Sequence, residues 1–409
     1  MTAIISEFKI AVRNLRRNTK RSLVAVMTVA GGVIAFVLAG GFIAWIFQDM
    51  REATIHSQLG HIQIVRPGYF EKGIADPYAF LLPGKSEQQT LLEATSGIRS
   101  LTPRLAFSGL LSLGDVTVPF TGEGIDPEGE RPISSRINIM SGRDLTHAKE
   151  MAVILGEGLA KNLGAKAGDS VVILSTAANG SPNAVELEVA GTFATITKEF
   201  DDNALRMPIA VARKLMRVDG ATSWIALLDK TEITTETILK IRPSLPPKDF
   251  QIIPWFDLAD FYNKTVTLFS KQVDVVKLII GLIIILTISN TQTMSVLERT
   301  TEIGTSLAIG LRSSEIMRLF LLEGALIGIV GGAMGVSLGY LLSLGVSAIG
   351  IPMPPPPGMT HGFTGQILVS SALALDAMIL ALVTTLLASA MPAWRASRMN
   401  IVDALRCNQ

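Results

Sequence analysis

The stretch LVAVMTVAGGVIAFVLAGGFIAWIF, residues 23–47, decides the fold because it contains no Asp, Glu, Lys or Arg. An α-helix needs about 20 apolar residues to cross a hydrocarbon core about 30 Å thick, so this stretch predicts a membrane-spanning helix. A cleaved signal peptide is the alternative. Its apolar core would have only about 7–15 residues, and no clear small-x-small cleavage site ends this stretch. We therefore expect a retained first span at residues 23–47.

The chain before this span is basic and amphipathic. Ile5, Phe8, Val12 and Leu15 recur at helical spacing, and the positions between them hold Lys9, Arg13, Arg16, Arg17, Lys20 and Arg21. This pattern is typical of a helix that lies on a membrane surface, which we expect at residues 1–22. The alternative is a positively charged flank without a helix of its own. In either case the positive charges favour a cytoplasmic N-terminus.

The composition of the whole chain agrees with a membrane protein. It is 409 residues long, 48% hydrophobic and only 17% charged, with a mean hydropathy of +0.42. The net charge of +1 gives no reason to expect nucleic-acid binding. The single cysteine, Cys407, allows neither an intrachain disulfide nor a thiolate metal site, and the four histidines do not cluster. We predict no metal site and no catalytic residue.

Residues 48–272 have the composition of a folded domain outside the membrane. Turn signals such as Arg66-Pro67-Gly68 and Asn179-Gly180-Ser181-Pro182 interrupt it. Alternating or β-branched runs predict strands at residues 61–65, 116–121, 171–175 and 186–189. Helical patterns appear at residues 86–95, 156–163, 211–217 and 235–241. The sequence therefore predicts a mixed α+β domain.

Three further spans follow this domain. Residues 278–297 carry no charge, which predicts a span at 273–297. Residues 324–375 also lack Asp, Glu, Lys and Arg, and they are too long for one helix. They are interrupted by Pro352, Pro354, Pro355, Pro356, Pro357 and Gly358. Because consecutive prolines break a helix, we expect spans at 319–349 and 369–394 joined by a Pro-rich loop at 350–368.

Positive charges orient the spans. Arg299, Arg312 and Arg318 lie in the loop at 298–318, whereas the Pro-rich loop has no Lys or Arg. Arg395, Arg398 and Arg406 follow the last span, in the tail at 395–409. The positive-inside rule places these segments and both termini in the cytoplasm. The expected fold is an α-helical membrane protein with four transmembrane helices plus a large α+β extracytoplasmic domain inserted between helices 1 and 2.

Two stretches carry a family resemblance. They are NTQTMSVLERTTEIGTSLAIGLRSSEIMRLFLLEGALIGIVGGAMGVSLGYLL at residues 290–342 and PAWRASRMNIVDALR at 392–406. Softer matches are LGHIQI at 59–64, GIDPEGE at 124–130 and VILGEGLAKNLGAKAGDSVVIL at 153–174. Together they resemble the FtsX-like permease family, and the architecture resembles its MacB and LolC/LolE branch of ABC transporters.

The resemblance implies a subunit of the bacterial inner membrane with a periplasmic domain. Such a subunit works as a homodimer, or as a heterodimer with a related permease, together with a separate cytoplasmic ABC ATPase. The ATPase binds ATP and Mg, so no cofactor is expected in this chain. Closure of the ATPases would move the helices and through them the periplasmic domain, a process called mechanotransmission. A periplasmic carrier or adaptor and membrane lipid are further partners that the resemblance allows.

The chain itself lacks the Gly-x-x-x-x-Gly-Lys-Ser/Thr spacing of a phosphate-binding loop. With the resemblance, the loop at 298–318 becomes the expected ATPase contact, whereas without it the loop could be merely solvated. The expected coupling residues are Glu298, Arg299, Glu302, Ile303, Gly304, Gly310, Arg312 and Glu315. Gly304 and Gly310 are expected to permit sharp changes of direction. Thr301 stands where family members often carry a basic residue.

Small and polar residues inside the spans predict helix packing. Gly328, Gly331, Gly332, Gly335 and Gly339 fall on one or two helical faces, and they indicate close packing within the chain, across a dimer, or both. Glu323 and Asp376 lie near span ends, where water can reach them, and we expect interfacial anchoring or helix pairing. The polar run at 287–293 predicts hydrogen bonds between neighbouring helices.

The resemblance leaves three functions open. The first is lipoprotein or lipid release, to which the LGHIQI stretch and the lack of a fused ATPase point. In that case the Pro-rich loop, with Met353, Met359 and Phe363, and the start of the second span would lie where acyl chains leave the bilayer. The second is drug or peptide efflux of the MacB type. The third is regulation of a periplasmic enzyme, as in FtsX. A membrane-bound enzyme is not expected because no nucleophile and base stand together.

Overall fold

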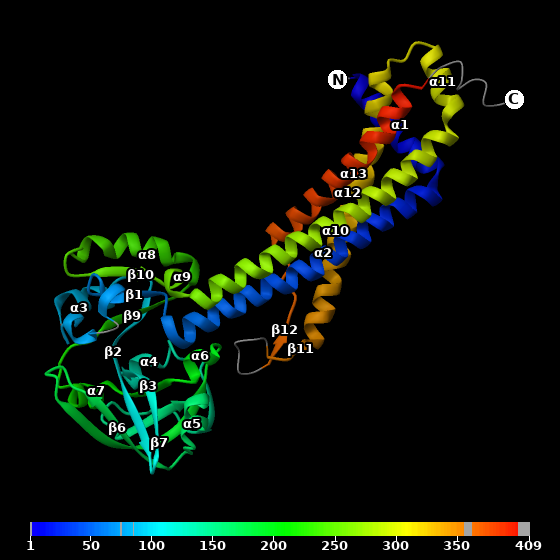
Figure 1. Ribbon diagram of the computed structural model, residues 1–409. Coiled ribbons are helices and arrows are strands. Elements are labelled where there is room, and N and C mark those ends of the chain that lie inside the picture. The colour runs from blue at the N-terminus through cyan, green and yellow to red at the C-terminus, as the bar shows by residue number, and fades with distance from the viewer. Residues whose placement is uncertain (1, 74–75, 85, 356–361, 400–409) are drawn as a thin grey trace. The chain divides into compact units, whose positions relative to one another are not determined.

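The computed structural model describes residues 2–73, 76–84, 86–355 and 362–399, without the side chains of residues 2–6 (Figure 1). The chain divides into two compact units. The helical unit comprises Met1–Phe47, Val266–Pro352 and Thr364–Gln409, and the mixed unit comprises Gln48–Thr265 and Met353–Phe363. Several residues named above lie outside the described residues: Pro356, Pro357, Gly358, Met359, Arg406 and Cys407. One of the four histidines, His361, also lies outside them.

Six helices contribute to the helical unit as described: α1 (Thr2–Arg17), α2 (Thr19–Thr54), α10 (Asp260–Glu298), α11 (Thr300–Ala308), α12 (Ser313–Ile349) and α13 (Ser371–Ser397). Of the described helices, α2, α10, α12 and α13 are long and apolar enough to cross a membrane, which confirms the four predicted apolar helices. Two short strands, β11 (Ile351–Met353) and β12 (Phe363–Gly365), pair between α12 and α13.

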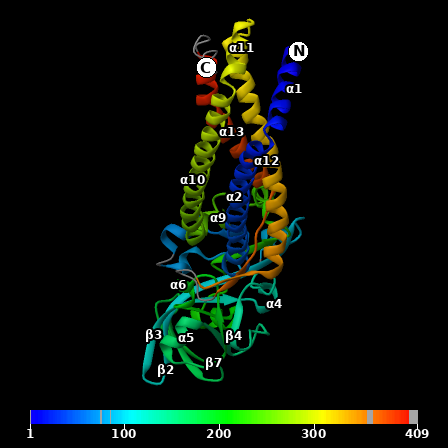
Figure 2. The same cartoon turned by 90° about the vertical axis from the view of Figure 1, so that its right-hand side faces the viewer.

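The four long helices lie side by side (Figure 2). Each buries some of its side chains against the others and leaves others exposed. Their shared core includes Val33 and Phe36 of α2, Ile284 of α10 and Ala381 of α13. Large apolar side chains on the outer faces stay bare, such as Leu286, which is 69% exposed. Apolar faces of this extent are stable when lipid covers them, so the exposure pattern agrees with a membrane-embedded bundle.

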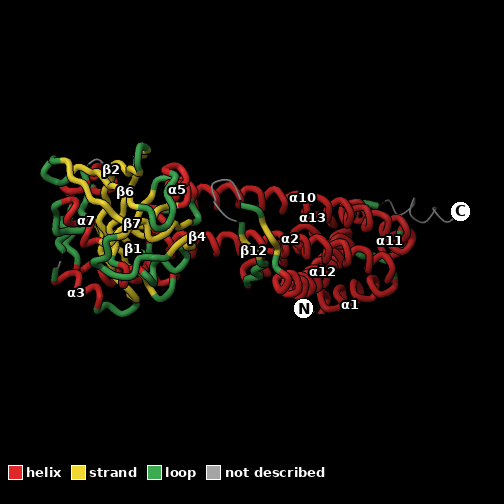
Figure 3. Tube along the Cα trace, turned by 90° about the horizontal axis from the view of Figure 1, so that it is seen from below, coloured by secondary structure: helices red, strands yellow, loops and turns green. Residues whose placement is uncertain are grey.

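The mixed unit is built around one large sheet (Figure 3). Its strands are β1 (Ile62–Val65), β2 (Ile98–Leu113), β3 (Val116–Ile125), β4 (Asn138–Gly142), β5 (Ala152–Gly156), β6 (Ser170–Thr176), β7 (Pro182–Ala194), β8 (Ala204–Pro208), β9 (Ser223–Leu228) and β10 (Gln251–Pro254). The strand order among the described residues is β10-β1-β9-β2-β3-β8-β5-β7-β4, and β6 pairs with β2 and β7. Pairing is antiparallel except for β3 with β8 and β5 with β7.

Short helices cover this sheet. They are η1 (Ile55–Leu59), η2 (Tyr69–Gly73), η3 (Pro77–Phe80), α3 (Glu87–Glu93), α4 (Pro127–Glu130), α5 (Glu157–Leu163), α6 (Lys198–Asp201), α7 (Ile209–Met216), η4 (Thr231–Ile233), α8 (Thr234–Ile241), η5 (Arg242–Ser244) and α9 (Trp255–Leu258). The eight predicted strands and helices of the domain all coincide with observed elements, namely β1, β3, β6 and β7 and α3, α5, α7 and α8.

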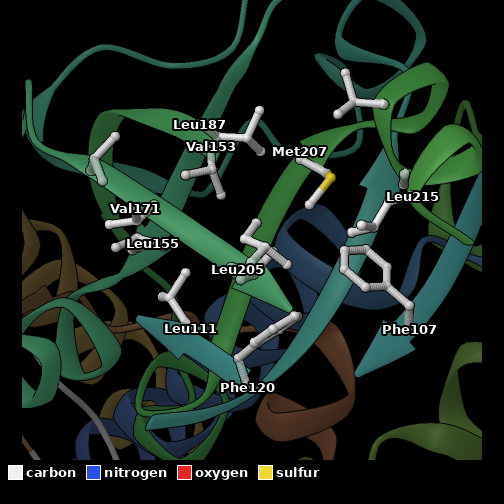
Figure 4. Close-up of a cluster of buried hydrophobic side chains, with 14 of the residues drawn as sticks. Phe107, Leu111, Phe120, Val153, Leu155, Val171, Leu187, Leu205, Met207 and Leu215 are labelled. Carbon is white, nitrogen blue, oxygen red and sulfur yellow. The ribbon is translucent and has the colours of Figure 1, made fainter. Parts of the chain in front are cut away.

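The largest core of the mixed unit gathers side chains from six strands and two helices. In Figure 4, Phe107 and Leu111 of β2, Phe120 of β3 and Leu205 of β8 point toward one another. The rings of Phe107 and Phe120 meet edge to face, with centroids 5.6 Å apart. A separate cluster surrounds Trp224, which is fully buried. The unit therefore has the burial to hold its shape without a disulfide.

The polar run in α10 does not behave as predicted. Thr287 donates to the carbonyl of Ile283 at 2.8 Å, and Thr291 donates to that of Thr287 at 2.9 Å. Thr293 likewise donates to a carbonyl four residues earlier in α10. The expected bonds between helices are therefore wrong for these threonines, because a hydroxyl in an apolar helix can always reach the carbonyl one turn back.

Candidate coupling site

The segment at 298–318 forms one short helix between two changes of direction. Arg299, with φ −102° and ψ 15°, separates α10 from α11, and Gly310 has φ +109°, which favours glycine. The backbone N–H of Arg312 donates to Glu315 Oε2 at 2.8 Å and so caps the N-terminus of α12. Gly304 lies buried inside α11, so the expected turn at Gly304 is wrong. The chain bends at Arg299 and Gly310 instead.

Two predicted coupling residues form ion pairs with basic residues near the N-terminus. Arg17 of α1 pairs with Glu302 at 2.7 Å, and Arg21 of α2 pairs with Glu298. The Arg17 and Glu302 side chains are each 52% exposed. The hydrogen bond from Arg17 is the main reason that the pKa of Glu302 lies below its ordinary value. Exposed pairs of this kind are weak and can exchange partners.

Behind this outer layer lies a buried pair. Arg299 Nη1 donates to Glu323 Oε1 at 3.0 Å, and Asn14 Nδ2 donates to the same oxygen at 2.8 Å. Glu323 is only 3% exposed. The expected helix pairing is therefore confirmed, but the expected access of water from an interface is wrong for Glu323. Asp376 behaves as expected, because it is exposed and pairs with Lys277 of α10 at 2.9 Å.

The segment also has an apolar side that the sequence analysis missed. Ile303 is buried with Val296, Ile316 and Phe320 in a small cluster. In contrast, Ile309 is 78% exposed and Leu311 is 45% exposed, on either side of Gly310. The signal in the sequence is a pair of large apolar residues, Ile309 and Leu311, on either side of Gly310.

The predicted packing glycines of α12 face two helices of the same chain. A Cβ atom at Gly331, Gly335 or Gly339 would lie 2.8, 2.6 or 3.1 Å from the side chains of Val29, Val33 and Val37 of α2, respectively. Gly328 and Gly332 face α13 instead, and Gly332 meets Met378. The glycines thus let both neighbouring helices approach α12 closely. These faces are filled within the chain.

At the other end of α2, buried arginines hold the backbone. Arg206 Nη2 donates to the carbonyl of Ser57 at 2.9 Å, and Arg104 donates to that of Gln58, both in η1. Arg104 pairs with Glu130, and Arg206 pairs with Glu123 at 2.8 Å. Burial alone would raise the pKa of Glu123, but Arg206 and Arg104 outweigh it and leave that pKa lowered.

An apolar cluster completes this junction. Ile55 of η1 packs with Ile225 of β9, Trp255 of α9 and Ala259, and Tyr262 at the start of α10 lies against the cluster. The rings of Trp255 and Tyr262 have centroids 5.3 Å apart. The end of α2 and the start of α10 therefore share one buried cluster with a strand of the sheet. Sequence reasoning missed this junction because its members come from distant segments.

Two family models match the chain. The FtsX-like permease C-terminal model matches residues 275–401, and the MacB-like periplasmic core domain model matches residues 22–243. Together, these two models identify a membrane permease. The chain belongs to the FtsX-like permeases with a MacB-like periplasmic core domain, that is, to the ABC transporter permeases of the MacB/LolC type. Membership of this family implies a cytoplasmic ATPase partner.

Curated relatives agree with this family. An uncharacterized ABC transporter permease of Methanocaldococcus jannaschii is 27% identical over 287 residues, 66% of each chain. The lipoprotein-releasing system transmembrane protein LolC of Xylella fastidiosa is 26% identical over 76% of this chain and 78% of its own. The macrolide export ATP-binding/permease protein MacB of Rhodospirillum rubrum is 27% identical over 97% of this chain and 59% of its own.

Solved structures of related domains were also compared with the chain. The periplasmic region of MacB from Actinobacillus actinomycetemcomitans is 18% identical and covers 50% of this chain and 93% of its own, with a TM-score of 0.37. The extracellular domain of the transporter YknZ is 14% identical and covers 47% of this chain and 100% of its own, with a TM-score of 0.34. The family assignment rests on the two family models.

Proposed function

We propose that the chain is the membrane subunit of a mechanotransmission-type ABC transporter. In this proposal a separate cytoplasmic ATPase, which binds ATP and Mg, docks on the segment at 298–318. The helices pass its movement to a periplasmic domain, expected at 48–272, that is inserted between the first two spans of the inner membrane. Both termini lie in the cytoplasm, and the loop at 350–368 is periplasmic. Two permease subunits, identical or related, form the transporter.

The junction in the mixed unit is the observation that best supports this proposal. The end of α2 and the start of α10 meet the same cluster around Trp255 and Ile225. Arg104 and Arg206 hold the backbone of η1 to β2 and β8 by buried, charge-balanced bonds. A displacement of either helix end must therefore move the sheet, since buried networks of this kind do not stretch.

The exposed side chains of the cytoplasmic segment suit a docking surface. Ile309 and Leu311 form an apolar tip beside the charged Arg312. Apolar side chains at the centre of an interface with charged residues around them are typical of protein contacts that bind through a few anchor residues. We therefore place the strongest ATPase contact at Ile309, with the charged residues of the segment at its edge.

For the cargo we propose a lipoprotein or lipid. The LolC relative, whose name describes a lipoprotein-releasing system, aligns over 76% of this chain and 78% of its own length. The rival is drug or peptide efflux, because the MacB relative named for macrolide export aligns over 97% of this chain. Regulation of a periplasmic enzyme is the third function that the family resemblance leaves open. For release or efflux, a periplasmic carrier or adaptor would be a further partner.

Reconstitution of the chain in lipid vesicles tests whether it depends on a separate ATPase and binds it through Ile309. The full chain in lipid vesicles should hydrolyse no ATP above empty vesicles, and should bind the cytoplasmic ABC ATPase of its own transporter. I309D should weaken that binding at least tenfold, because it places a charge in an apolar contact. L239D, on the 64% exposed Leu239 of α8, is the matched control and should bind normally. Hydrolysis by the chain alone, or equal binding by both variants, would contradict the proposal.

A release assay separates the cargoes. Vesicles that contain the chain and its ATPase are loaded with a diacylated lipoprotein or with a radiolabelled macrolide. ATP-dependent transfer of the lipoprotein to a soluble carrier supports the leading proposal. Macrolide movement without lipoprotein release would favour the efflux function instead. Movement of neither, together with activation of a periplasmic hydrolase, would favour the regulator.

A further inference from the structure

Five side chains of the helical unit form a hydrogen-bonded circuit that begins and ends on α1. Asn14 and Arg17 lie three residues apart on α1, so they share one face of that helix. Asn14 bonds Glu323 of α12, and Arg17 bonds Glu302 of α11. Arg299 joins the two halves, with Nη1 on Glu323 at 3.0 Å and Nε on Glu302 at 3.4 Å. Glu323 of α12 thereby bonds α1 directly, and it reaches α11 through Arg299, which lies between α10 and α11.

The circuit has a buried half and an exposed half. Glu323 is 3% exposed and Arg299 8% exposed, and the guanidinium of Arg299 also lies 5.5 Å from the ring centre of Phe320. The Arg17 and Glu302 side chains are each 52% exposed. Solvent screens the outer pair and makes it weak. Loss of the cation beside a buried carboxylate, in contrast, strongly destabilises the fold. The inner half therefore fixes the geometry.

A small polar cavity lies beside the buried half. It has a volume of about 30 Å³ and is lined by side chains that include Asn18, Ser22, Gln292 and Glu323. Gln292 is 4% exposed, and its Oε1 has no hydrogen-bond partner among the described residues. The volume suffices for about two water molecules, which would satisfy Gln292 and complete the shell around the ion pair. The buried half is thus a polar joint within the helical unit.

We propose that Glu323 is a positioning residue that makes α1, α11 and α12 move as one body. The inference rests on the proposed function, because it names the residue through which movement of the docking segment enters the bundle. The backbone is non-helical at Arg299 and turns at Gly310, at either end of α11. Without Glu323, α11 would keep only the exposed pair of Glu302 with Arg17, the bond of Glu302 to Arg299 and the apolar contacts of Ile303. Docking would then move α11 with less movement of α1 and α12.

Hydrogen exchange on the full chain in lipid nanodiscs tests the joint without any ATPase. In E323A, backbone amides of α1 and α11 should exchange at least roughly tenfold faster than in the unchanged chain. The isosteric variant E323Q keeps the acceptor for Asn14 and loses the charge, so it should show a smaller increase in the same peptides. E323Q also keeps the test valid where E323A does not fold. Unchanged exchange of α1 and α11 in E323Q would overturn the proposal.

D376N is the matched control for this experiment. It removes the pair between Asp376 of α13 and Lys277 of α10, which joins two other helices of the unit. Exchange in α1 and α11 should stay as in the unchanged chain. A rise equal to that in E323Q would show general loosening of the bundle and would contradict a specific joint at Glu323.

A second readout separates this inference from the proposed function. In vesicles with the ATPase, E323Q should bind the ATPase normally but release at least roughly fivefold less cargo per ATP hydrolysed. I309D should show the reverse, with weakened binding and unchanged exchange in α1. Failure of the unchanged chain to bind any ATPase would defeat the proposed function alone. Normal binding with an unchanged release ratio in E323Q would defeat the positioning role alone.

Discussion

The mixed unit and the helical unit both contain networks of arginines and carboxylates, but the two differ in exposure. In the mixed unit the side chains of Arg104 and Glu130 are 5% and 2% exposed, and that of Arg206 is 1% exposed. In the helical unit the network runs from buried Glu323 out to Arg17 and Glu302 at 52%. The first network is suited to hold η1 rigidly to β2 and β8. The second suits a joint that is fixed by buried bonds at Glu323 and is only weakly paired at its exposed side.

The largest predicted effect is at the rigid network. R206M leaves Glu123 with one fewer cation and frees the carbonyl of Ser57, so the mixed unit should lose about 3–5 kcal/mol of stability. Chemical unfolding of the full chain in detergent, followed by the fluorescence of buried Trp224, measures this loss. K161A removes an exposed pair with Glu157 and is the control, with an expected cost of about 0.5 kcal/mol or less. An equal loss of stability in R206M and K161A would show that the buried network is no stronger than an exposed ion pair.

The next effect is a pH dependence in the mixed unit. His61 is 1% exposed, and its Nδ1 accepts from the backbone N–H of Leu228 at 3.0 Å, which requires a neutral ring. Burial is the main reason that the pKa of His61 is lowered to about 4. Between the unfolded pKa of about 6.5 and pH 4 the unfolded chain binds a proton that the folded chain does not. Stability should therefore fall as pH falls through this window, by up to about 3 kcal/mol.

Substitution tests this pH dependence. H61Q should be less stable at neutral pH but should lose most of the slope between pH 6.5 and 4. H147Q, at an exposed histidine, should keep the slope. Unfolding midpoints measured across this range give the answer, and an unchanged slope in H61Q would refute the assignment.

A smaller effect is expected inside the helical unit, where small residues and not charges bring helices together. G335V should cost about 1–3 kcal/mol, because a Cβ at Gly335 would lie 2.6 Å from Val33 of α2. G345V adds the same atoms to the same helix at a site with nothing within 4 Å. Thermal unfolding in detergent should therefore separate the two variants. Similar melting temperatures would mean that α2 and α12 are not closely packed.

The smallest effect is expected at the exposed edge of the coupling segment. E298Q removes the pair with Arg21, whose side chain is 41% exposed. The cost should be less than about 1 kcal/mol and should shrink further as salt is added. The same melting experiment at low and high ionic strength measures it. A loss as large as that of R206M would show that the outer pair is structural.

The sequence predicted those features that repeat along the chain. The absence of charge located four apolar helices, and the alternation of Leu187 and Val189 with Glu186 and Glu188 located β7. It missed β5, β8 and β9, whose residues are all buried, because a strand covered on both faces shows no alternation. Gly304 was misjudged because a glycine inside a helix and a glycine at a turn look alike without their neighbours.

The polar networks could not be predicted for a different reason. Arg206 meets Glu123 from a position 83 residues away, and Asn14 meets Glu323 from 309 residues away. No local pattern links such pairs, since only the folded chain brings them together. A lone carboxylate near the end of a span is equally compatible with water and with a buried partner. The charges and the family resemblance together singled out the segment at 298–318, whereas its exposed apolar side chain Ile309 was missed.

The central claim is that the mixed unit and the coupling segment lie on opposite sides of the inner membrane. Labelling of single cysteines in intact cells with a membrane-impermeant maleimide tests it most directly, with Cys407 replaced by Ser. L239C, on α8 of the mixed unit, and I309C, at the tip of the segment, are the reporters, and both side chains are well exposed. We predict that the reagent labels L239C as soon as it can pass the outer membrane or cell wall. It should label I309C only after the inner membrane is broken. The reverse pattern would contradict the central claim.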